Sequence, residues 1–286
     1  MIKSNFAAYF FIPLHANYVK KIRPMNKKLG KIIALANQKG GVGKTTTTIN
    51  LAASLATLDK QVLVIDADPQ ANASSGLGVD MQTVEYSLYD CISGNIDIRE
   101  AIYTTDVTGL DIIPSNINLA GAEIEMIKME KREYVLRNAL EPLRQEYDYI
   151  FIDCSPSLGL ITVNALTAAD SIIIPVQCEY FALEGLSDLL NTVRHVHSNM
   201  NPQLNAIGLL LLRVMFDKRV TLSIHVSEQL EKHFGNRVFK TVIPRNVRMA
   251  EAPSYGLPGV DFDPSSKGAK AYMACAEELL AWLAAH

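Results

Sequence analysis

The stretch over residues 31–48 constrains the fold of this chain more than any other part of the sequence. It opens with an apolar run, residues 32–36, that has the length of a buried strand and is too short for a helix. A glycine-rich segment follows, and an Ala- and Leu-rich run to residue 58 then predicts a helix. A strand, a glycine loop and a helix in this order are the setting that a phosphate-binding loop requires.

The loop has the residue types that hold the phosphates of a nucleotide. Its backbone comes from four consecutive residues: Gly40, Gly41, Val42 and Gly43. Glycines let backbone N–H groups turn toward an anion, and the next helix adds the positive end of its dipole. Lys44 can bridge the outer phosphates, Thr45 can bind Mg²⁺, and Thr46 can reach a phosphate nearer the ribose. The alternative, a glycine turn that binds nothing, does not explain these side chains.

The start of the loop departs from the ordinary phosphate-loop pattern. That pattern has a glycine five positions before Gly43, where this chain has Gln38. A second lysine, Lys39, stands directly before the glycines instead. The loop therefore offers two ammonium groups to a polyphosphate.

Carboxylates follow two further apolar runs. Residues 61–66 read as a second buried strand that leads into Asp66 and Asp68, and residues 149–153 read as a central strand that ends at Asp153. The carboxyl ends of parallel strands are where open sheets bind ligands. Asp66 and Asp68 can therefore orient an attacking water or hold Mg²⁺ through water, and we expect Asp153, with Thr45, to hold Mg²⁺. A polar turn without chemistry is the alternative for residues 66–72.

At least five strand-like runs alternate with helical runs. This alternation predicts an α/β fold, with a mostly parallel, twisted sheet and helices on both faces, as a single P-loop domain over residues 29–286. Further strands are expected over residues 109–114, 171–176, 205–212 and 240–246, and an Ala-rich helix over 268–283. The charged stretch 120–144 predicts a pair of surface-packed helices whose apolar spacing includes Ile124 and Ile127.

Residues 1–28 do not fit this pattern. An apolar, aromatic run over 6–14 is followed by a basic cluster over 20–23, the reverse of the order in a secretory signal. Met25 would make a natural start shortly before the first strand. We expect an extension that is either disordered or the product of a start codon set too far upstream. An arm that touches a membrane or DNA is the alternative.

The positive charge of the chain is local. The net charge of −3 does not indicate nucleic-acid binding. Residues 213–248, however, carry eight Lys and Arg, among them Arg213, Arg219 and Arg248, against three acids. Such a local excess is a candidate footprint for a polyanion, with a solvated charged face as the alternative.

Cysteines, histidines and apolar runs argue against other classes of site. The four cysteines lack paired spacing, which argues against a disulfide framework or a zinc site and fits a reducing cytoplasm. His195 and His197 are two residues apart and do not share a helix face, so they predict surface side chains rather than metal ligands. No apolar run has the length of a membrane-spanning helix.

These features together resemble the deviant Walker A ATPases, the group that contains ParA, MinD and the nitrogenase iron protein. The resemblance rests first on the string that runs from Lys39 to Thr46. Residues 66–73, 176–185 and 242–254 further resemble the ParA/Soj branch, in strings typical of its chromosomal members. The similarity covers nearly everything from residue 31 to residue 281.

Resemblance to the ParA/Soj branch implies an ATPase that uses ATP and Mg²⁺ to segregate chromosome or plasmid DNA. It implies an ATP-dependent homodimer that binds double-stranded DNA without sequence preference, in the cytoplasm and on the nucleoid. It also implies a ParB-type centromere-binding partner that stimulates a weak intrinsic hydrolysis. No stable association with a membrane is expected.

The resemblance also assigns roles to single residues. Lys39 would reach across the dimer to the phosphates bound by the other subunit, and Asp68 would position the hydrolytic water. Arg219 and Arg248 match the arginines that the family uses on DNA. Pro244, with Asn246 beside it, lies where family members line the adenine.

The chain departs from the family pattern at two positions. Ser155 stands where the family has proline, which predicts a looser second switch segment. Leu257 replaces a lysine near the expected DNA face. Neither position belongs to the phosphate-binding loop.

Other branches of the group are the alternatives. A membrane-cycling positioning ATPase of the MinD type needs a basic amphipathic helix at its C-terminus, whereas residues 277–286 here lack Lys and Arg. An electron-transfer ATPase like the iron protein needs cysteines in a glycine-flanked context that these four lack. A non-enzymatic adaptor is disfavoured because Asp68 and Asp153 are both present.

Overall fold

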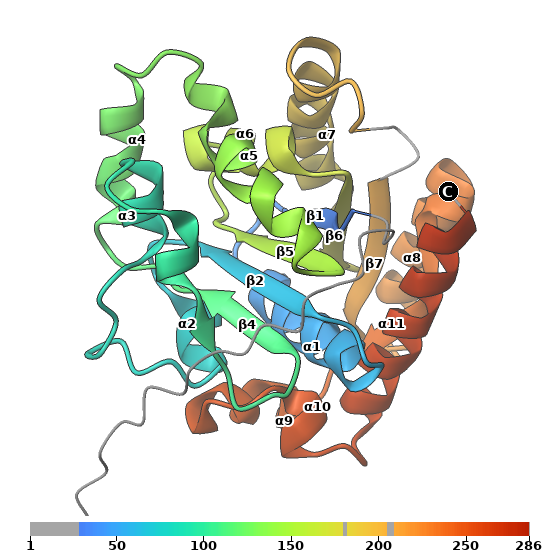
Figure 1. Ribbon diagram of the computed structural model, residues 1–286. Helices are drawn as coiled ribbons and strands as arrows, with labels where there is room; N and C mark the ends of the chain where they lie inside the picture. The colour runs from blue at the N-terminus through green and yellow to red at the C-terminus, as the bar shows by residue number, and fades with distance from the viewer. Residues whose placement is uncertain (1–28, 180–181, 205–208, 286) are drawn as a thin grey trace, which may run out of the picture.

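The computed structural model describes residues 29–179, 182–204 and 209–285, so the predicted extension at residues 1–28 lies outside the described part (Figure 1). The described strands form one eight-stranded sheet in the order β3-β4-β2-β5-β1-β6-β7-β8. Neighbouring strands are parallel except β3 and β4. The predicted mostly parallel sheet is confirmed. The strands are β1 (Lys31–Leu35), β2 (Val62–Ala67), β3 (Tyr103–Thr104), β4 (Leu110–Ile113), β5 (Tyr149–Cys154), β6 (Ser171–Gln177), β7 (Leu209–Phe216) and β8 (Val238–Pro244).

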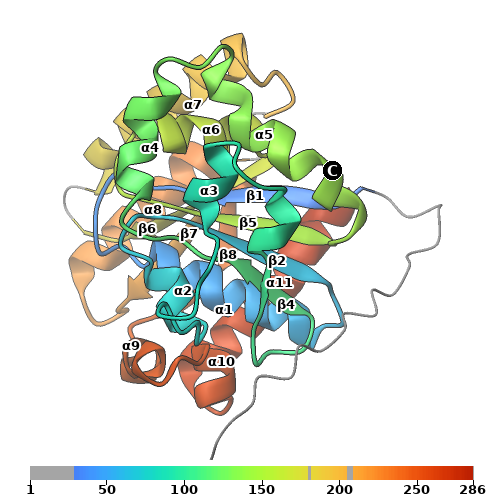
Figure 2. The same ribbon diagram turned by 60° about the vertical axis from the view of Figure 1, so that its left-hand side comes forward.

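Helices lie on both faces of this sheet. Figures 1 and 2 show α5, α6 and α7 on one side and α1 and α11 on the other. The described α-helices are α1 (Lys44–Thr57), α2 (Asn72–Gly76), α3 (Leu88–Ile92), α4 (Leu119–Met126), α5 (Val135–Leu140), α6 (Leu160–Ala168), α7 (Ala182–Asn199), α8 (Thr221–Phe234), α9 (Val247–Glu251), α10 (Gly259–Phe262) and α11 (Lys267–Ala285). Short 3-10 turns are η1 (Ile98–Ala101), η2 (Arg132–Tyr134), η3 (Glu141–Gln145), η4 (Gly235–Arg237) and η5 (Ala252–Tyr255).

Alternate residues of the central strands face opposite sides, which gives the molecule two apolar cores. In β1, Ile32 and Ala34 belong to the core under α3 to α7, whereas Ile33 and Leu35 belong to the core under α1 and α11. All four side chains are fully buried. Because helices cover both faces, the central strands are apolar along their length and do not alternate with polar residues.

Strand β7 extends further along the sequence than predicted. The expected strand over residues 205–212 starts outside the described part, and the structure places β7 at Leu209–Phe216. The predicted end of this strand at residue 212 is wrong, because the strand continues to Phe216. Arg213 ends the apolar run in the sequence, but its side chain is buried and hydrogen-bonded, so the strand continues through it. The pairing with β8 shifts register on either side of Arg213.

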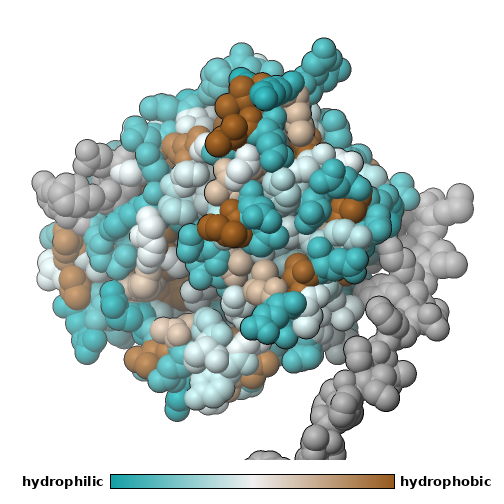
Figure 3. All heavy atoms as spheres, turned by 90° about the vertical axis from the view of Figure 1, so that its left-hand side faces the viewer, coloured by the Kyte–Doolittle hydropathy of each residue, from teal (hydrophilic) through white to brown (hydrophobic). Residues whose placement is uncertain are grey.

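The charged stretch 120–144 does not form two continuous packed helices. It is divided among α4, η2, α5 and η3, and Ile124 and Ile127 are 69% and 60% exposed. Figure 3, which views the side of the molecule that carries α3 and α4, shows apolar patches among polar ones. Three other positions of the same predicted spacing, Leu136, Leu140 and Leu143, are fully buried as expected. Apolar spacing predicts one buried face only along an unbroken helix, and here the helix is broken.

The edge strand β8 is covered by the last helix. Glu278 of α11 accepts hydrogen bonds from the backbone N–H groups of Lys240 and Thr241, at 2.6 and 2.8 Å. The predicted Ala-rich helix over 268–283 is confirmed by α11. Among the described helices, none has the length and apolar composition that crossing a bilayer requires.

Candidate functional site

The carboxyl ends of the central parallel strands meet at one edge of the sheet. The register pairs Leu35 of β1 with Asp153 of β5, and Asp153 also pairs with Asp66 of β2. The glycine loop leaves β1 at this edge and enters α1 at Lys44. The fold therefore brings together the loop and the two strand-end carboxylates that the sequence predicts.

The glycine loop has a backbone geometry suited to an anion. Gly41 and Gly43 have φ of 72° and 81°, in the left-handed region that residues with a Cβ seldom adopt. A Cβ at Gly40 or Gly41 would meet no described atom within 4 Å, so the loop is open on that side. No described side chain caps the first turn of α1. Its N–H groups are therefore available to an anion.

The ammonium of Lys44 lies against this loop. Its Nζ donates to the carbonyl of Lys39 at 3.4 Å, and the residue is only 7% exposed. Burial lowers the pKa of Lys44, while nearby negative charges, that of Asp153 first, oppose the shift. One long hydrogen bond uses little of the capacity of three N–H donors. The ammonium can therefore donate to phosphate oxygens.

Asp153 is held by two threonines of α1. Its Oδ2 accepts from the Thr45 hydroxyl at 2.7 Å, and its Oδ1 accepts from the Thr48 hydroxyl at 2.8 Å. The residue is fully buried, and burial, followed by the charge of Asp66, raises the pKa of Asp153 to about 7. Sequence analysis missed Thr48. Its spacing of three residues from Thr45, which places both on one helix face, is the signal that could have identified it.

Asp66 and Asp68 have different surroundings. Asp66 is fully buried, and its Oδ2 accepts from the backbone N–H and the hydroxyl of Ser74 at 2.8 and 2.7 Å. Burial raises the pKa of Asp66 to about 6, against the hydrogen bonds from Ser74. Asp68 is partly exposed, and its Oδ1 accepts from the backbone N–H of Gln70 at 3.0 Å. Asp66 therefore anchors α2, whereas Asp68 is the carboxylate that water can reach.

The residues present fit a magnesium ion that also binds phosphate. Within the described part of the chain, no three His, Cys, Asp or Glu side chains gather into a metal site. Mg²⁺ commonly takes one or two protein oxygens and completes its shell with phosphates and waters. The Thr45 hydroxyl and the Asp153 carboxylate supply such a pair. Asp66 is the weaker candidate, because Ser74 and the backbone N–H of Asp68 already occupy its oxygens.

Lys39 lies at the start of the loop and is paired within its own chain. Its Nζ lies 2.8 Å from Glu179 Oε2, and its backbone N–H donates to Asn37 Oδ1 at 2.9 Å. The string over residues 176–185 includes Glu179, but the sequence assigned it no role. Because the two charges are 140 residues apart in the chain, only the fold reveals the pair.

Arg219 and Arg248 follow the carboxyl ends of neighbouring strands. Phe216 of β7 pairs with Pro244 of β8, so both arginines leave the sheet at the edge that carries the glycine loop. The Arg219 side chain is 86% exposed and pairs with Asp217 at 2.7 Å. This guanidinium holds the pKa of Asp217 at about 2. Arg248 is 56% exposed and pairs with a carboxylate three residues later at 2.9 Å. Both arginines are accessible, and both are partly neutralised.

Arg213 does not belong to an exposed basic surface. Its side chain is 7% exposed, and its guanidinium donates to the Phe239 carbonyl at 2.6 Å and to the Ser227 hydroxyl at 2.8 Å. It also pairs with Glu231. Its place in the predicted polyanion footprint is therefore wrong, because its charge joins β7 to α8 and β8.

The predicted adenine residues lie just beyond the same edge. Pro244 is the last residue of β8. The Asn246 side chain caps α9, where its Oδ1 accepts from the backbone N–H of Arg248 at 2.8 Å. Asn246 thus has a structural role in addition to the predicted ligand contact. Of the two departures from the family pattern, Ser155 shares a hydrogen bond of 2.9 Å with Ser157.

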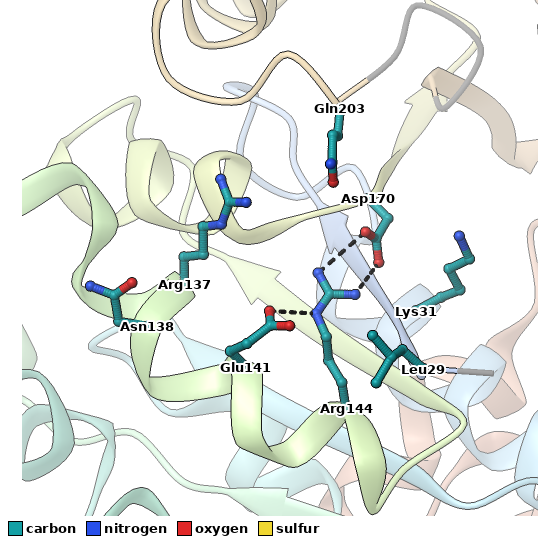
Figure 4. Close-up of a pocket in the computed structure, with 8 residues that line it drawn as sticks. All are labelled: Leu29, Lys31, Arg137, Asn138, Glu141, Arg144, Asp170 and Gln203. Carbon is teal, nitrogen blue, oxygen red and sulfur yellow. Dashed lines mark hydrogen bonds and ion pairs between the residues drawn. The ribbon is translucent and has the colours of Figure 1, made fainter. Parts of the chain in front are cut away.

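A separate hollow of about 450 Å³ lies at the amino end of the strands, away from the loop (Figure 4). Arg144 crosses it and is saturated: its two terminal nitrogens reach Asp170 at 2.7 and 3.2 Å, and its Nε reaches Glu141 at 3.0 Å. These contacts join η3 to the start of β6. The hollow is lined by Leu29, Lys31, Arg137, Asn138, Glu141, Arg144, Asp170 and Gln203, none of which is a predicted site residue.

Comparison with known proteins shows what this chain is similar to. A family model described as an AAA domain matches residues 30–206. The sporulation initiation inhibitor protein Soj of Bacillus subtilis is 55% identical over 253 residues, which cover 88% of this chain and 99% of Soj. The chromosome partitioning protein ParA of Myxococcus xanthus is 48% identical over 252 residues, which cover 88% of each chain.

A solved structure shares the fold and the extent of the chain. The cobyrinic acid a,c-diamide synthase of Mycobacterium smegmatis, with a bound ATP analogue and magnesium, has a TM-score of 0.77 and 36% identity. The match covers 88% of this chain and 95% of that one. The two-lysine loop, the strand-end carboxylates and the 55% identity to Soj lead to one conclusion. The chain belongs to the ParA/Soj family of P-loop ATPases.

Proposed function

We propose that the protein is an ATPase that segregates chromosome or plasmid DNA, with residues 29–286 as its ATPase domain. The observation that carries this proposal is the contact of Thr45 with Asp153, beside Lys44 and the open glycine loop. A hydroxyl, a buried acid and an ammonium around one loop suit a metal-bound polyphosphate. Soj and ParA share more identity with this chain than the synthase does, which favours partition over other chemistry.

In this proposal the glycine loop and the first turn of α1 bind the phosphates of ATP. Lys44 contacts the outer phosphates, and Thr46 contacts one nearer the ribose. Thr45 and, through water, Asp153 hold Mg²⁺, which lowers the negative charge on the phosphates when it is bound. Pro244 and Asn246 line the adenine.

Hydrolysis depends on a second copy of the chain. Asp68 orients the attacking water, since its carboxylate is the one that solvent reaches. Lys44, together with Lys39 of the other subunit, neutralises charge that develops on the leaving oxygens. Because Lys39 acts across the dimer, turnover stays weak until ATP has joined two subunits.

The dimer binds double-stranded DNA through Arg219 and Arg248. Both side chains are exposed and lie at the edge of the sheet that binds nucleotide. Arginine contacts to phosphates are insensitive to sequence and sensitive to salt. A ParB-type partner stimulates hydrolysis and releases the dimer, so that the protein cycles between the nucleoid and the surrounding cytoplasm without a stable membrane contact.

The test is ATP hydrolysis with and without non-specific DNA and the ParB-type protein encoded nearby, at two salt concentrations. We expect slow turnover alone, a rise with both additions, and loss of the rise at the higher salt concentration. Sedimentation with a non-hydrolysable ATP analogue should show dimers. Single subunits at every nucleotide concentration would overturn the proposal, and ATP-dependent binding to liposomes would favour the membrane-cycling alternative.

A further inference from the structure

We propose that Glu179 is a positioning residue that holds Lys39 against its own subunit until the phosphates on a second copy compete for the lysine. The inference rests on the proposed function, in which Lys39 acts across the dimer. It adds a competitor within the chain for the same ammonium. Dimer formation then requires an exchange of partners, from carboxylate to phosphate.

The pair is built from elements that the fold fixes. Lys39 Nζ lies 2.8 Å from Glu179 Oε2, and the other carboxylate oxygen of Glu179 accepts from Gln177 Nε2. Gln177 ends β6, the strand beside β1. The carboxylate is therefore oriented from β6 toward the start of the glycine loop, and Lys39 meets it there.

The backbone at Lys39 is fixed independently of its side chain. The N–H of Lys39 donates to Asn37 Oδ1 at 2.9 Å, and Asn37 Nδ2 donates to the carbonyl of Pro175 at 2.7 Å. The first bond orders the loop, and the second ties Asn37 to β6. A rotation of the Lys39 side chain can therefore release Glu179 without any movement of the loop that binds the phosphates.

Exposure makes this pair easy to exchange. The side chains of Lys39 and Glu179 are 41% and 47% exposed. An ion pair at such exposure changes an equilibrium by about 1.5- to 5-fold. A triphosphate carries more negative charge than one carboxylate. When a second subunit presents a triphosphate, the Lys39 ammonium therefore binds the phosphate in preference to Glu179. Two pairs break for each dimer, which predicts a combined effect of about 2- to 30-fold.

The experiment measures the dimer fraction by sedimentation velocity, as a function of the concentration of a non-hydrolysable ATP analogue with Mg²⁺. The variants are Glu179→Gln, Glu179→Asp, Lys39→Ala and the double variant Lys39→Ala/Glu179→Gln. Glu277→Gln, which removes one negative charge from an exposed position on α11, is the matched control. Circular dichroism melting checks that each variant is folded.

We expect the analogue concentration at half-dimerisation to fall about 1.5- to 5-fold in Glu179→Gln, the factor for one pair, because each dimer binds two nucleotides. Glu179→Asp should shift the same way with its charge retained, because its shorter side chain no longer reaches Lys39. Glu277→Gln should match the wild type. In the Lys39→Ala background, Glu179→Gln should cause no shift, because the residue acts through Lys39.

An unchanged or weakened dimer in folded Glu179→Gln would overturn the inference, because Glu179 would then not compete with dimer formation. An equal shift in the Lys39→Ala background would overturn it as well, since the effect would not pass through the lysine. Failure of the proposed function looks different. In that case Lys39→Ala would dimerise at the wild-type analogue concentration.

Discussion

At the scale of single residues, two buried carboxyl groups set the electrostatics of the site. Asp66 and Asp153 pair in register and are both fully buried. Mainly because of burial, their pKa values rise from 3.8 to about 6 and about 7. At a pH above 3.8 and below its raised pKa, each carboxyl keeps its proton in the native state, whereas the same group in the unfolded chain has already released it.

We predict that the free energy of unfolding of the nucleotide-free protein decreases as the pH rises from about 4 to 7. The native state binds more protons than the unfolded state in this window, and each such carboxyl contributes up to about 1.4 kcal/mol per pH unit. Asp153→Asn removes one of the two groups. From pH 4 to pH 7, the free energy of unfolding of this variant should therefore decrease by about 1–3 kcal/mol less than that of the wild type. Urea denaturation at pH 4 and at pH 7 measures the difference.

Glu277→Gln is the control for this pH dependence. It lies at an exposed position of α11, so its stability should follow that of the wild type at each pH. If the curves for the wild type and Asp153→Asn are parallel, Asp153 does not titrate as described.

Asp68→Ala should separate hydrolysis from dimer formation. The carboxylate is the one at this site that water reaches, and loss of a residue that orients or activates the nucleophile costs about 10²–10⁴-fold in rate. Phosphate release should fall by at least about 100-fold while the ATP-bound dimer forms and stays on DNA. Sedimentation with ATP and a DNA-retention assay measure the second part. Unchanged turnover would contradict the role of Asp68.

The site could be predicted where its chemistry is contiguous in the chain. The two lysines and Thr45 lie within seven residues of one another, 39 to 45, so spacing alone identifies them. The partners of these groups could not be predicted. Thr48 meets Asp153 across 105 residues and Lys39 meets Glu179 across 140. Such contacts depend on the order and register of the strands, which apolar runs do not encode.

At the scale of secondary-structure elements, Arg213 joins three of them through a buried guanidinium. It donates to the Phe239 carbonyl of β8 and to Ser227 of α8, and it pairs with Glu231 of α8. Arg213→Ala would leave this carbonyl without its donor and Glu231 without its cation. We predict a loss of about 2–3 kcal/mol in unfolding free energy, moderated because Glu231 is partly exposed and can be rehydrated.

Urea denaturation measures this loss, with Lys232→Ala as the control. Lys232 lies on an exposed position of the same helix, so its replacement should change the unfolding free energy by less than about 0.5 kcal/mol. Equal effects of the two substitutions would show that the buried contacts of Arg213 contribute nothing to stability.

Elements buried on both faces could be predicted best. β1, β2, β5 and β6 are continuous apolar runs, and each lies within about a residue of its expected position. Errors arose where a polar residue is buried or a helix is interrupted. The buried Arg213 ended the apolar run, so the end of β7 at Phe216 was not predicted. Ile124 lies within α4 but away from the face that buries Leu119, Ala122 and Met126. In both cases tertiary contacts outweighed the local pattern.

At the scale of the whole molecule, DNA binding must come from a local surface, because the net charge is −3. We predict that Arg219→Glu with Arg248→Glu abolishes DNA retention while ATP-dependent dimers persist. Replacing one of the two arginines at a time should reduce the magnitude of the slope of log K against log salt by about 0.9. Fluorescence anisotropy with non-specific duplex DNA across a salt series measures both quantities. Loss of the dimers as well would show that these arginines are structural.

Asp217→Asn should have the opposite effect on DNA binding, because it removes a negative charge beside Arg219. Asp217 pairs with Arg219 at 2.7 Å, so its carboxylate competes with DNA phosphates for that guanidinium. Removing the charge should raise DNA affinity by about 2- to 5-fold at low salt, and less at high salt. An unchanged affinity would mean that Arg219 does not contact DNA.

The covered edge of β8 affects how readily two molecules can associate through their sheets. Glu278 occupies the N–H groups of Lys240 and Thr241, which an open edge would offer to a strand of another molecule. At the far side of the sheet, β3 is only two residues long. Both features reduce what the two margins of the sheet offer to strand-to-strand pairing with another molecule. A protein whose dimers collect on DNA, as proposed here, would therefore have less tendency to join neighbouring copies edge to edge.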